Sequence, residues 1–139
     1  MDELRKIWLA CAVDTEGSIH FEKHRGKKHE SFSIRISLCN TNLHFVQKAQ
    51  EICGIGHIGL EPKVVHLPVY RWYIGKASEC ERILREILPY LIIKKGKAEQ
   101  ALLFLKYRRQ KGKYARHGIV EKIFADNKES EIKNILELL

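Results

Sequence analysis

The chain has 139 residues, of which 45% are hydrophobic and 30% charged, values typical of a single globular domain with a sizeable core. No apolar run approaches membrane-spanning length, and the first six residues lack the layout of a secretory signal. We therefore expect an intracellular protein, cytoplasmic or organellar, with no membrane partner. The net charge of +8 is what a protein with a polyanionic partner would carry, although an unrelated basic enzyme would show the same charge.

The first predicted element is a helix that ends at Glu16. One of its faces carries small or apolar side chains at helical spacing, namely Ile7, Ala10, Cys11 and Asp14. Small residues there would let a second helix approach closely. Two carboxylates stand at the helix C-terminus, where the dipole is already negative, and a nearby cation would offset that cost. Gly17 is expected to supply the backbone freedom for an abrupt exit from the helix.

Two hairpins and three further helices follow. Residues 18–24 alternate in polarity, a basic turn covers 25–30, and a second strand covers 32–39. Asn40, Thr41 and Asn42 offer N-caps for a helix that Gly54 stops, and a less regular hairpin runs from about Gly56 to Gly75. A capping box at 78–81 starts a helix that reaches Pro89, and another helix runs to about Tyr107. This order predicts an α+β domain with an antiparallel four-stranded sheet covered by helices on one face.

The uncovered sheet face is the candidate binding surface. It would carry hydrogen-bonding side chains of the kind that read base edges from a β-ribbon in a major groove: His20, Glu22, His24, Ser33, Arg35, Ser37, Lys63, His66, Arg71 and Tyr73. The turn adds the basic residues Arg25, Lys27 and Lys28. A merely solvated sheet face is the alternative interpretation of each of these residues.

Residues 94–116 form a basic segment with Glu99 as their only acid. Beyond Lys94, the segment offers phosphate-neutralising side chains at Lys95, Lys97, Arg108, Arg109, Lys111, Lys113 and Arg116. A solvated helix face followed by a loop is the alternative. Residues 119–139 are predicted to form an amphipathic helical tail. The four cysteines are widely spaced in apolar surroundings, which predicts buried free thiols.

The segment Leu9–Gly17, LACAVDTEG, resembles the LAGLIDADG motif of homing endonucleases, with Cys11 in place of the first glycine and Glu16 in place of the second aspartate. The order of elements over about Leu4–Arg109 is similar to the αββαββα order of that family. The resemblance implies a single LAGLIDADG domain over 1–139. Because only one motif is present, it also implies a homodimer in which Ile7, Ala10, Cys11 and Asp14 line the helix contact.

The resemblance further implies a site-specific double-strand DNA endonuclease, intron-encoded, that cuts a long pseudo-palindromic target. Glu16 and the Thr15 carbonyl would bind Mg²⁺, or Mn²⁺ or Ca²⁺ in its place, with Asp14 as a further candidate ligand. Lys94 matches the family's active-site lysine, with Lys95 one register away. Asn40 occupies the place of a polar residue, often glutamine, that holds solvent near the metal.

Two other classes of protein remain open. One is a non-catalytic binder of the same fold, either a regulator or an intron RNA maturase whose partner is the host intron RNA. The other is an unrelated basic α+β enzyme in which the motif arises by chance, which would bind DNA weakly and need not dimerise.

Overall fold

The computed structural model describes residues 1–26, 30–61, 67–111 and 123. Its elements run in the order α1 (Glu3–Glu16), β1 (Gly17–Arg25), β2 (Glu30–Asn40), α2 (Leu43–Cys53), β3 (His57–Glu61), β4 (Val69–Ile74), α3 (Ala77–Ile87), the short 3₁₀ helix η1 (Leu88–Tyr90) and α4 (Lys95–Lys111). The predicted α+β class and the four-stranded antiparallel sheet are confirmed. Within the described ranges, no helix combines the length and apolar character needed to cross a membrane.

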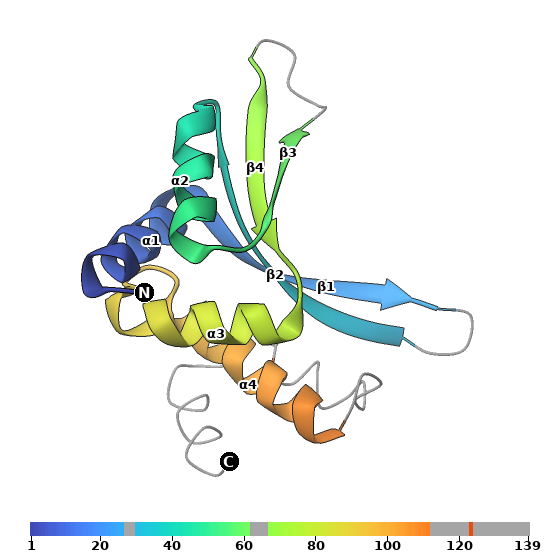
Figure 1. Cartoon of the computed structure of the whole chain (residues 1–139). Coiled ribbons are helices and arrows are strands. Elements are labelled where there is room, and N and C mark those ends of the chain that lie inside the picture. The colour runs from blue at the N-terminus through green and yellow to red at the C-terminus, as the bar shows by residue number, and fades with distance from the viewer. Residues whose placement is uncertain (27–29, 62–66, 112–122, 124–139) are drawn as a thin grey trace.

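The sheet has the order β1-β2-β4-β3, and every neighbouring pair is antiparallel. Figure 1 shows the helices gathered on one side of this twisted sheet, while the two hairpins extend away from them. Alternation along the strands sends Ile34, Ile36 and Leu38 toward the helices, where Trp72 and Ile74 of β4 join them, all five almost fully buried. The neighbouring positions therefore belong to the uncovered face.

Helix caps follow the sequence in part. The Asp2 side chain caps α1 by accepting from the Arg5 amide at 2.9 Å, and Asn42 caps α2. Gly54 ends α2 at φ 68°, as predicted. The prediction of a capping box at 78–81 is wrong, because α3 already begins at Ala77 and no side-chain hydrogen bond caps its N-terminus. Helix α4 also continues past Tyr107 to Lys111.

Gly17 is required for a reason that the sequence did not reveal. Its φ of −109° lies in the extended region, so it supplies no left-handed conformation at the end of α1. A Cβ placed there would meet the Leu38 side chain and the Val13 Cα at 2.8 Å, and the Ser37 carbonyl oxygen at 2.9 Å. A glycine therefore lets the end of α1 lie directly against β2.

Candidate active site and nucleic-acid interface

The C-terminal end of α1 holds the motif residues that were predicted to carry chemistry. Glu16 is the last residue of the helix and its side chain is exposed. Thr15 is also exposed, and its hydroxyl donates to the Cys11 carbonyl oxygen at 2.8 Å. A carboxylate in water at this point keeps its oxygens available for a ligand.

Asp14 has a different environment. It is only 7% exposed, and its two carboxylate oxygens accept the backbone N–H groups of Ile92, at 2.8 Å, and Lys94, at 2.9 Å. The Lys94 ammonium returns a hydrogen bond of 2.7 Å to the Asp14 carbonyl oxygen. These three bonds fix the segment that precedes α4 against the end of α1. The Lys94 charge also offsets the negative end of the helix dipole, where the sequence indicated a need for a cation.

Lys94 therefore lies beside the end of α1, because the carbonyl oxygen that it contacts belongs to Asp14, two residues before Glu16. One of its three N–H donors is used by the Asp14 carbonyl, and the other two have no partner among the described residues. Asn40 ends β2, and its side-chain oxygen accepts the Asn42 amide at 2.8 Å. Because Gly17 pairs with Leu38, the end of β2 passes next to the residue that follows Glu16.

An apolar strip lies along the outer side of α1. Ile7 is 43% exposed and Cys11 is exposed, and across a hollow of about 290 Å³ they face the exposed residues Ile92 and Ile93. Of the predicted interface residues, Ala10 and Asp14 are buried within the chain itself, so Ile7 and Cys11 are the two that face outward. The sequence analysis missed Ile92 and Ile93. Their position between Pro89 and two lysines was the available signal.

The prediction of buried thiols is correct for two of the four cysteines. Cys53 and Cys80 are buried, and burial raises the pKa of each thiol to about 12. Cys11 is exposed and Cys39 is half-buried, so the prediction was wrong for both. Cys11 lies on the outer side of α1, and Cys39 lies on the uncovered sheet face, where its Sγ accepts from Arg71 Nε at 3.3 Å.

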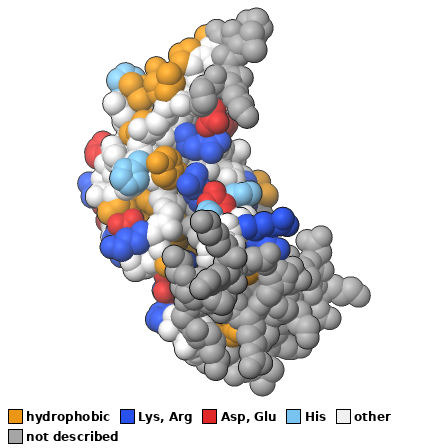
Figure 2. Space-filling view, turned by 90° about the vertical axis from the view of Figure 1, so that its right-hand side faces the viewer, with side chains coloured by type: hydrophobic (Ala, Val, Ile, Leu, Met, Phe, Trp, Pro, Cys, Tyr) orange, Lys and Arg blue, Asp and Glu red, His pale blue; other side chains and the backbone are white. Residues whose placement is uncertain are grey.

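The uncovered sheet face has the predicted polar character. Figure 2 shows a view in which basic, acidic and histidine side chains are interspersed. A shallow hollow of about 300 Å³ on this face is lined by Ser18, His20, Glu22, Arg35, Ser37 and Arg71. The structure thus brings together predicted residues from β1, β2 and β4. It adds Ser18, whose hydroxyl lies 3.0 Å from that of Ser37, and which alternation along the strand could have identified.

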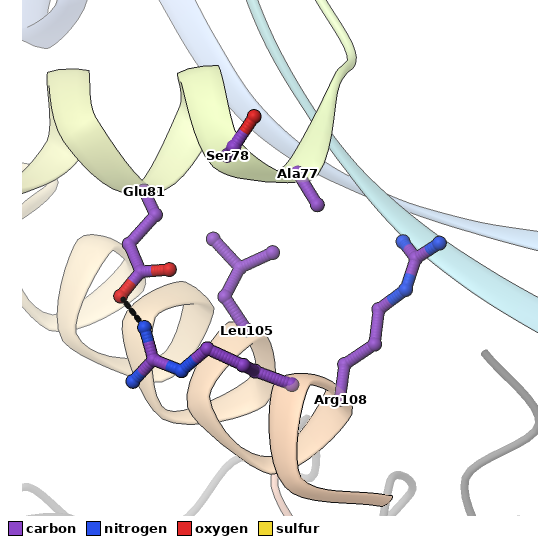
Figure 3. Close-up of a pocket in the computed structure, with 6 residues that line it drawn as sticks. Ala77, Ser78, Glu81, Leu105 and Arg108 are labelled. Carbon is purple, nitrogen blue, oxygen red and sulfur yellow. Dashed lines mark hydrogen bonds and ion pairs between the residues drawn. The ribbon is translucent and has the colours of Figure 1, made fainter. Parts of the chain in front are cut away.

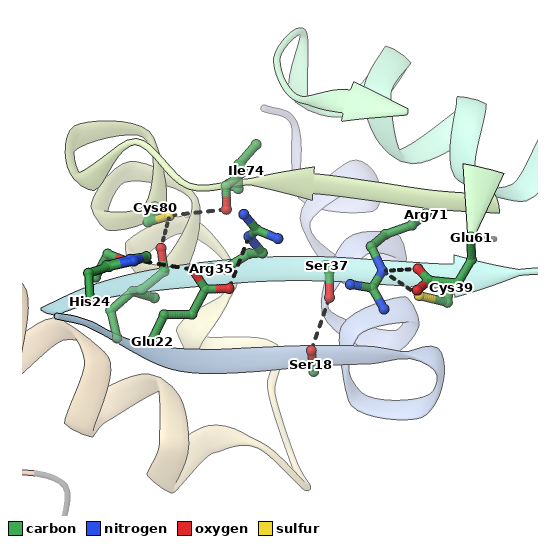
Figure 4. Close-up of polar contacts among 12 residues, drawn as sticks. Ser18, Glu22, His24, Arg35, Ser37, Cys39, Glu61, Arg71, Ile74 and Cys80 are labelled. Atoms are coloured by element: carbon green, nitrogen blue, oxygen red, sulfur yellow. Dashed lines mark hydrogen bonds and ion pairs between the residues drawn. The ribbon is translucent and has the colours of Figure 1, made fainter. Parts of the chain in front are cut away.

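Many of these side chains are held by each other (Figure 4). Glu22 pairs with Arg35 at 3.4 Å, and His24 Nε2 lies 2.8 Å from the Ser33 hydroxyl. The Arg35 guanidinium lies over the Tyr73 ring, 4.8 Å from its centre. On β4, Arg71 pairs with Glu61 of β3 at 3.0 Å. Glu61 was not predicted, because the register of the second hairpin was not evident from the sequence.

The basic segment divides into two groups. Lys95 and Lys97 are exposed at the start of α4. Near its end, Arg108 donates to the Phe32 carbonyl oxygen at 3.3 Å, and Arg109 pairs with Glu81 at 2.8 Å across a hollow of about 330 Å³ between α3 and α4 (Figure 3). These two arginines therefore contact β2 and α3.

Several predicted residues lie outside the described side chains, namely Lys27, Lys28, Lys63, His66, Lys113 and Arg116. The tail over 119–139 does too, apart from the buried Ile123, and for Lys111 only the backbone is described. Arg25 is exposed at the end of β1.

Comparison with solved structures defines the class of fold. The homing endonuclease I-CvuI, solved in complex with the I-CreI target, superposes with a TM-score of 0.72 at 17% identity, covering 97% of this chain and 94% of its own. I-TnaI, also a homing endonuclease, gives 0.72 at 14% identity, with 95% of each chain covered. No family model and no curated protein matches the sequence.

The chain thus has the fold of the LAGLIDADG homing endonucleases, in agreement with the motif in α1. A third neighbour, the LAGLIDADG homing endonuclease I-SmaMI bound to cleaved DNA, gives a TM-score of 0.70 at 17% identity. This match covers 96% of the present chain but only 48% of the I-SmaMI chain.

Proposed function

We propose that this chain is one subunit of a homodimeric, divalent-metal-dependent endonuclease that cuts both strands of DNA at a long pseudo-palindromic site. The observation that carries the proposal is the end of α1. The helix ends there in the exposed carboxylate of Glu16, and the Lys94 ammonium is bonded to the carbonyl oxygen of Asp14, two residues earlier. The outer side of the helix is apolar and open.

The apolar strip supports the dimer. Ile92 is 86% exposed and Ile93 71% exposed, and covering such side chains contributes about 1.5–3 kcal/mol each. A second copy is the partner that fits, since a two-fold contact of this strip with itself would place the two α1 helices side by side. The match to half of the I-SmaMI chain is consistent with a functional unit of twice this size.

Sedimentation velocity tests the dimer. Ile92→Glu should convert the dimer to monomer, because it places two charges in an apolar contact. Leu60→Glu is the matched control, since Leu60 is 63% exposed but lies on β3, away from the strip. A wild-type protein that stays monomeric at micromolar concentration would contradict the proposed assembly.

The residues present suit a hard divalent cation. Glu16 and the Thr15 carbonyl offer oxygen ligands, which Mg²⁺ prefers together with water. Within the described residues, one chain has no cluster of three or more His, Cys, Asp or Glu side chains. In the proposed site, the remaining ligands come from Glu16 of the second subunit and from DNA phosphates. The neighbour I-CvuI was solved with DNA in the presence of Mg or Ca.

A bound cation would supply Lewis-acid stabilisation of charge at the scissile phosphate and an activated water. The chain's own residues would do the rest. Glu16 would hold the cation site at the subunit contact, and Lys94 would use its two remaining N–H donors to stabilise negative charge on the phosphate. Asn40 would position solvent from the end of β2. Asp14 would keep this arrangement in place through the segment that it binds.

The uncovered sheet face would contact DNA in the major groove. Its polar residues come from three adjacent strands, and exposed Lys95 and Lys97 add positive charge at the start of α4. The remaining predicted DNA contacts, including Arg25 and those outside the described residues, belong to the same proposal.

Incubation with a plasmid library of random sites tests the function. In Mg²⁺ we expect cleavage of both strands at one long, nearly palindromic site, and none when EDTA removes the metal. Tight, salt-dependent binding of DNA or intron RNA without any cleavage would contradict the enzyme and favour the regulator or maturase. Absence of both would favour an unrelated basic enzyme.

A further inference from the structure

Two arginines of the uncovered sheet face share one arrangement. Arg35 on β2 and Arg71 on β4 each lie against a glutamate of the neighbouring strand, Glu22 on β1 and Glu61 on β3. In both pairs the carboxylate approaches the Nε atom, at 3.4 Å for Arg35 and 3.0 Å for Arg71. Figure 4 shows the two pairs along the same face of the sheet.

Arg35 is held on more than one side. Its Nε is buried, and among the described residues it has no well-aligned hydrogen bond, although the Glu22 carboxylate lies beside it. The Arg35 Cζ also lies over the Tyr73 ring, 4.8 Å from its centre. Glu22 is in turn 3.7 Å from His24. These contacts reduce the rotamer freedom that an exposed arginine would otherwise lose on binding.

Arg71 has an equivalent support. Its Nε donates to the Cys39 Sγ at 3.3 Å, next to the ion pair with Glu61. Among the described residues, the terminal nitrogens Nη1 and Nη2 of Arg71 and of Arg35 take part in no hydrogen bond. Each guanidinium therefore keeps its two terminal nitrogens, which carry parallel N–H donors, for a partner outside the described residues.

This pair of donors suits a guanine better than a phosphate. The O6 and N7 atoms of guanine accept two parallel N–H bonds in the major groove, and the gain depends on orientation. Phosphate attraction depends mainly on net charge, which the adjacent glutamate largely cancels. A carboxylate beside each arginine would thus weaken a phosphate contact while keeping the two terminal N–H donors of the guanidinium in position for a base.

We propose that Arg35 and Arg71 each read one guanine in every half of the DNA target, an inference that rests on the proposed function and deepens it. The register gives the spacing. Cys39 pairs with Arg71, and Arg35 lies four residues earlier on β2. Four residues of strand span about 13 Å, and one strand step adds about 5 Å sideways, so the two arginines are about 14 Å apart. At about 3.4 Å per base pair, the two G·C pairs lie about four base pairs apart.

Binding selection from a library of random DNA duplexes, followed by sequencing, tests this inference. Wild type should enrich two G·C pairs at this spacing in each half-site. Arg35→Gln should lose the guanine preference at one of them by at least about fivefold and shift it toward adenine, because glutamine pairs with adenine. Arg71→Gln should do the same at the other. Arg82→Gln on α3 removes the same charge away from the sheet and should leave both positions unchanged.

Glu61→Gln tests whether Glu61 positions Arg71 for a base or merely stabilises the fold. Loss of its negative charge should raise affinity for random DNA, while the guanine preference at the Arg71 position falls. An enriched long site without G·C pairs at this spacing would overturn the inference and leave the proposed function standing. The inference would also be overturned if Arg35→Gln and Arg71→Gln weakened binding to all DNA sequences equally. If the wild-type protein binds no DNA in the selection, the proposed function fails, and this inference fails with it.

Discussion

Replacing Asp14 by asparagine tests how the end of α1 is built. The buried carboxylate accepts two backbone N–H groups, at 2.8 and 2.9 Å, and each bond to a charged acceptor contributes about 1.5–3 kcal/mol. Asparagine keeps one oxygen but turns an N–H₂ group toward the other donor, so one bond is lost and one becomes neutral. We expect a loss of about 2–3 kcal/mol in the free energy of unfolding, or about 6–12 °C in Tm.

Urea unfolding at pH 7 measures this loss. Asp2→Asn is the matched control, because Asp2 also accepts a backbone N–H but is exposed, and asparagine caps a helix equally well. Its cost should stay within about 0.5 kcal/mol. An Asp14→Asn protein as stable as wild type, yet unable to cut DNA, would refute the positioning role and assign Asp14 to the chemistry itself.

Two further predictions concern the stability of the fold. Gly17→Ala should destabilise it by about 1–3 kcal/mol in urea unfolding, because the added Cβ would meet Leu38, Val13 and the Ser37 carbonyl within 2.9 Å. Gly75→Ala, with open space around the Cβ, should be neutral or slightly stabilising; equal effects of the two changes would contradict the close contact. Stability should also fall as the pH rises from about 9 toward 12, since unfolded thiols ionise near 9 whereas Cys53 and Cys80 hold their protons to about 12. The slope is about 1.4 kcal/mol per pH unit and thiol, so Cys53→Ala should be measurably less sensitive to alkaline pH, and an unchanged slope would count against burial as the cause.

The sequence predicted the fold well because its strongest signals are local. Alternation identified β1 and β2, and residues such as Asn42 and Gly54 mark the limits of α2 through cap chemistry alone. The role of Gly17 could not be predicted in this way, because its necessity comes from Leu38, a residue on another element.

The candidate site shows the same limit. The family resemblance pointed to Glu16 and Lys94 as candidates, but the burial of Asp14 depends on the segment at Ile92–Lys94, about 80 residues away in sequence. The pair of Arg71 with Glu61 depends on the register of β3 with β4, which single-strand patterns do not fix. Contacts between distant segments were therefore the part that needed a structure.

Cleavage by Glu16→Gln at the DNA site selected by wild type is the most direct test of the proposed active site. Glutamine is nearly the same size but lacks the negative charge that a divalent cation requires, so we predict that cleavage in Mg²⁺ falls by at least about 100-fold while DNA affinity is kept or slightly increased. Glu51→Gln, an exposed acid on α2, should cut like wild type. Cleavage by Glu16→Gln at the wild-type rate would contradict the account of the end of α1 as the catalytic centre.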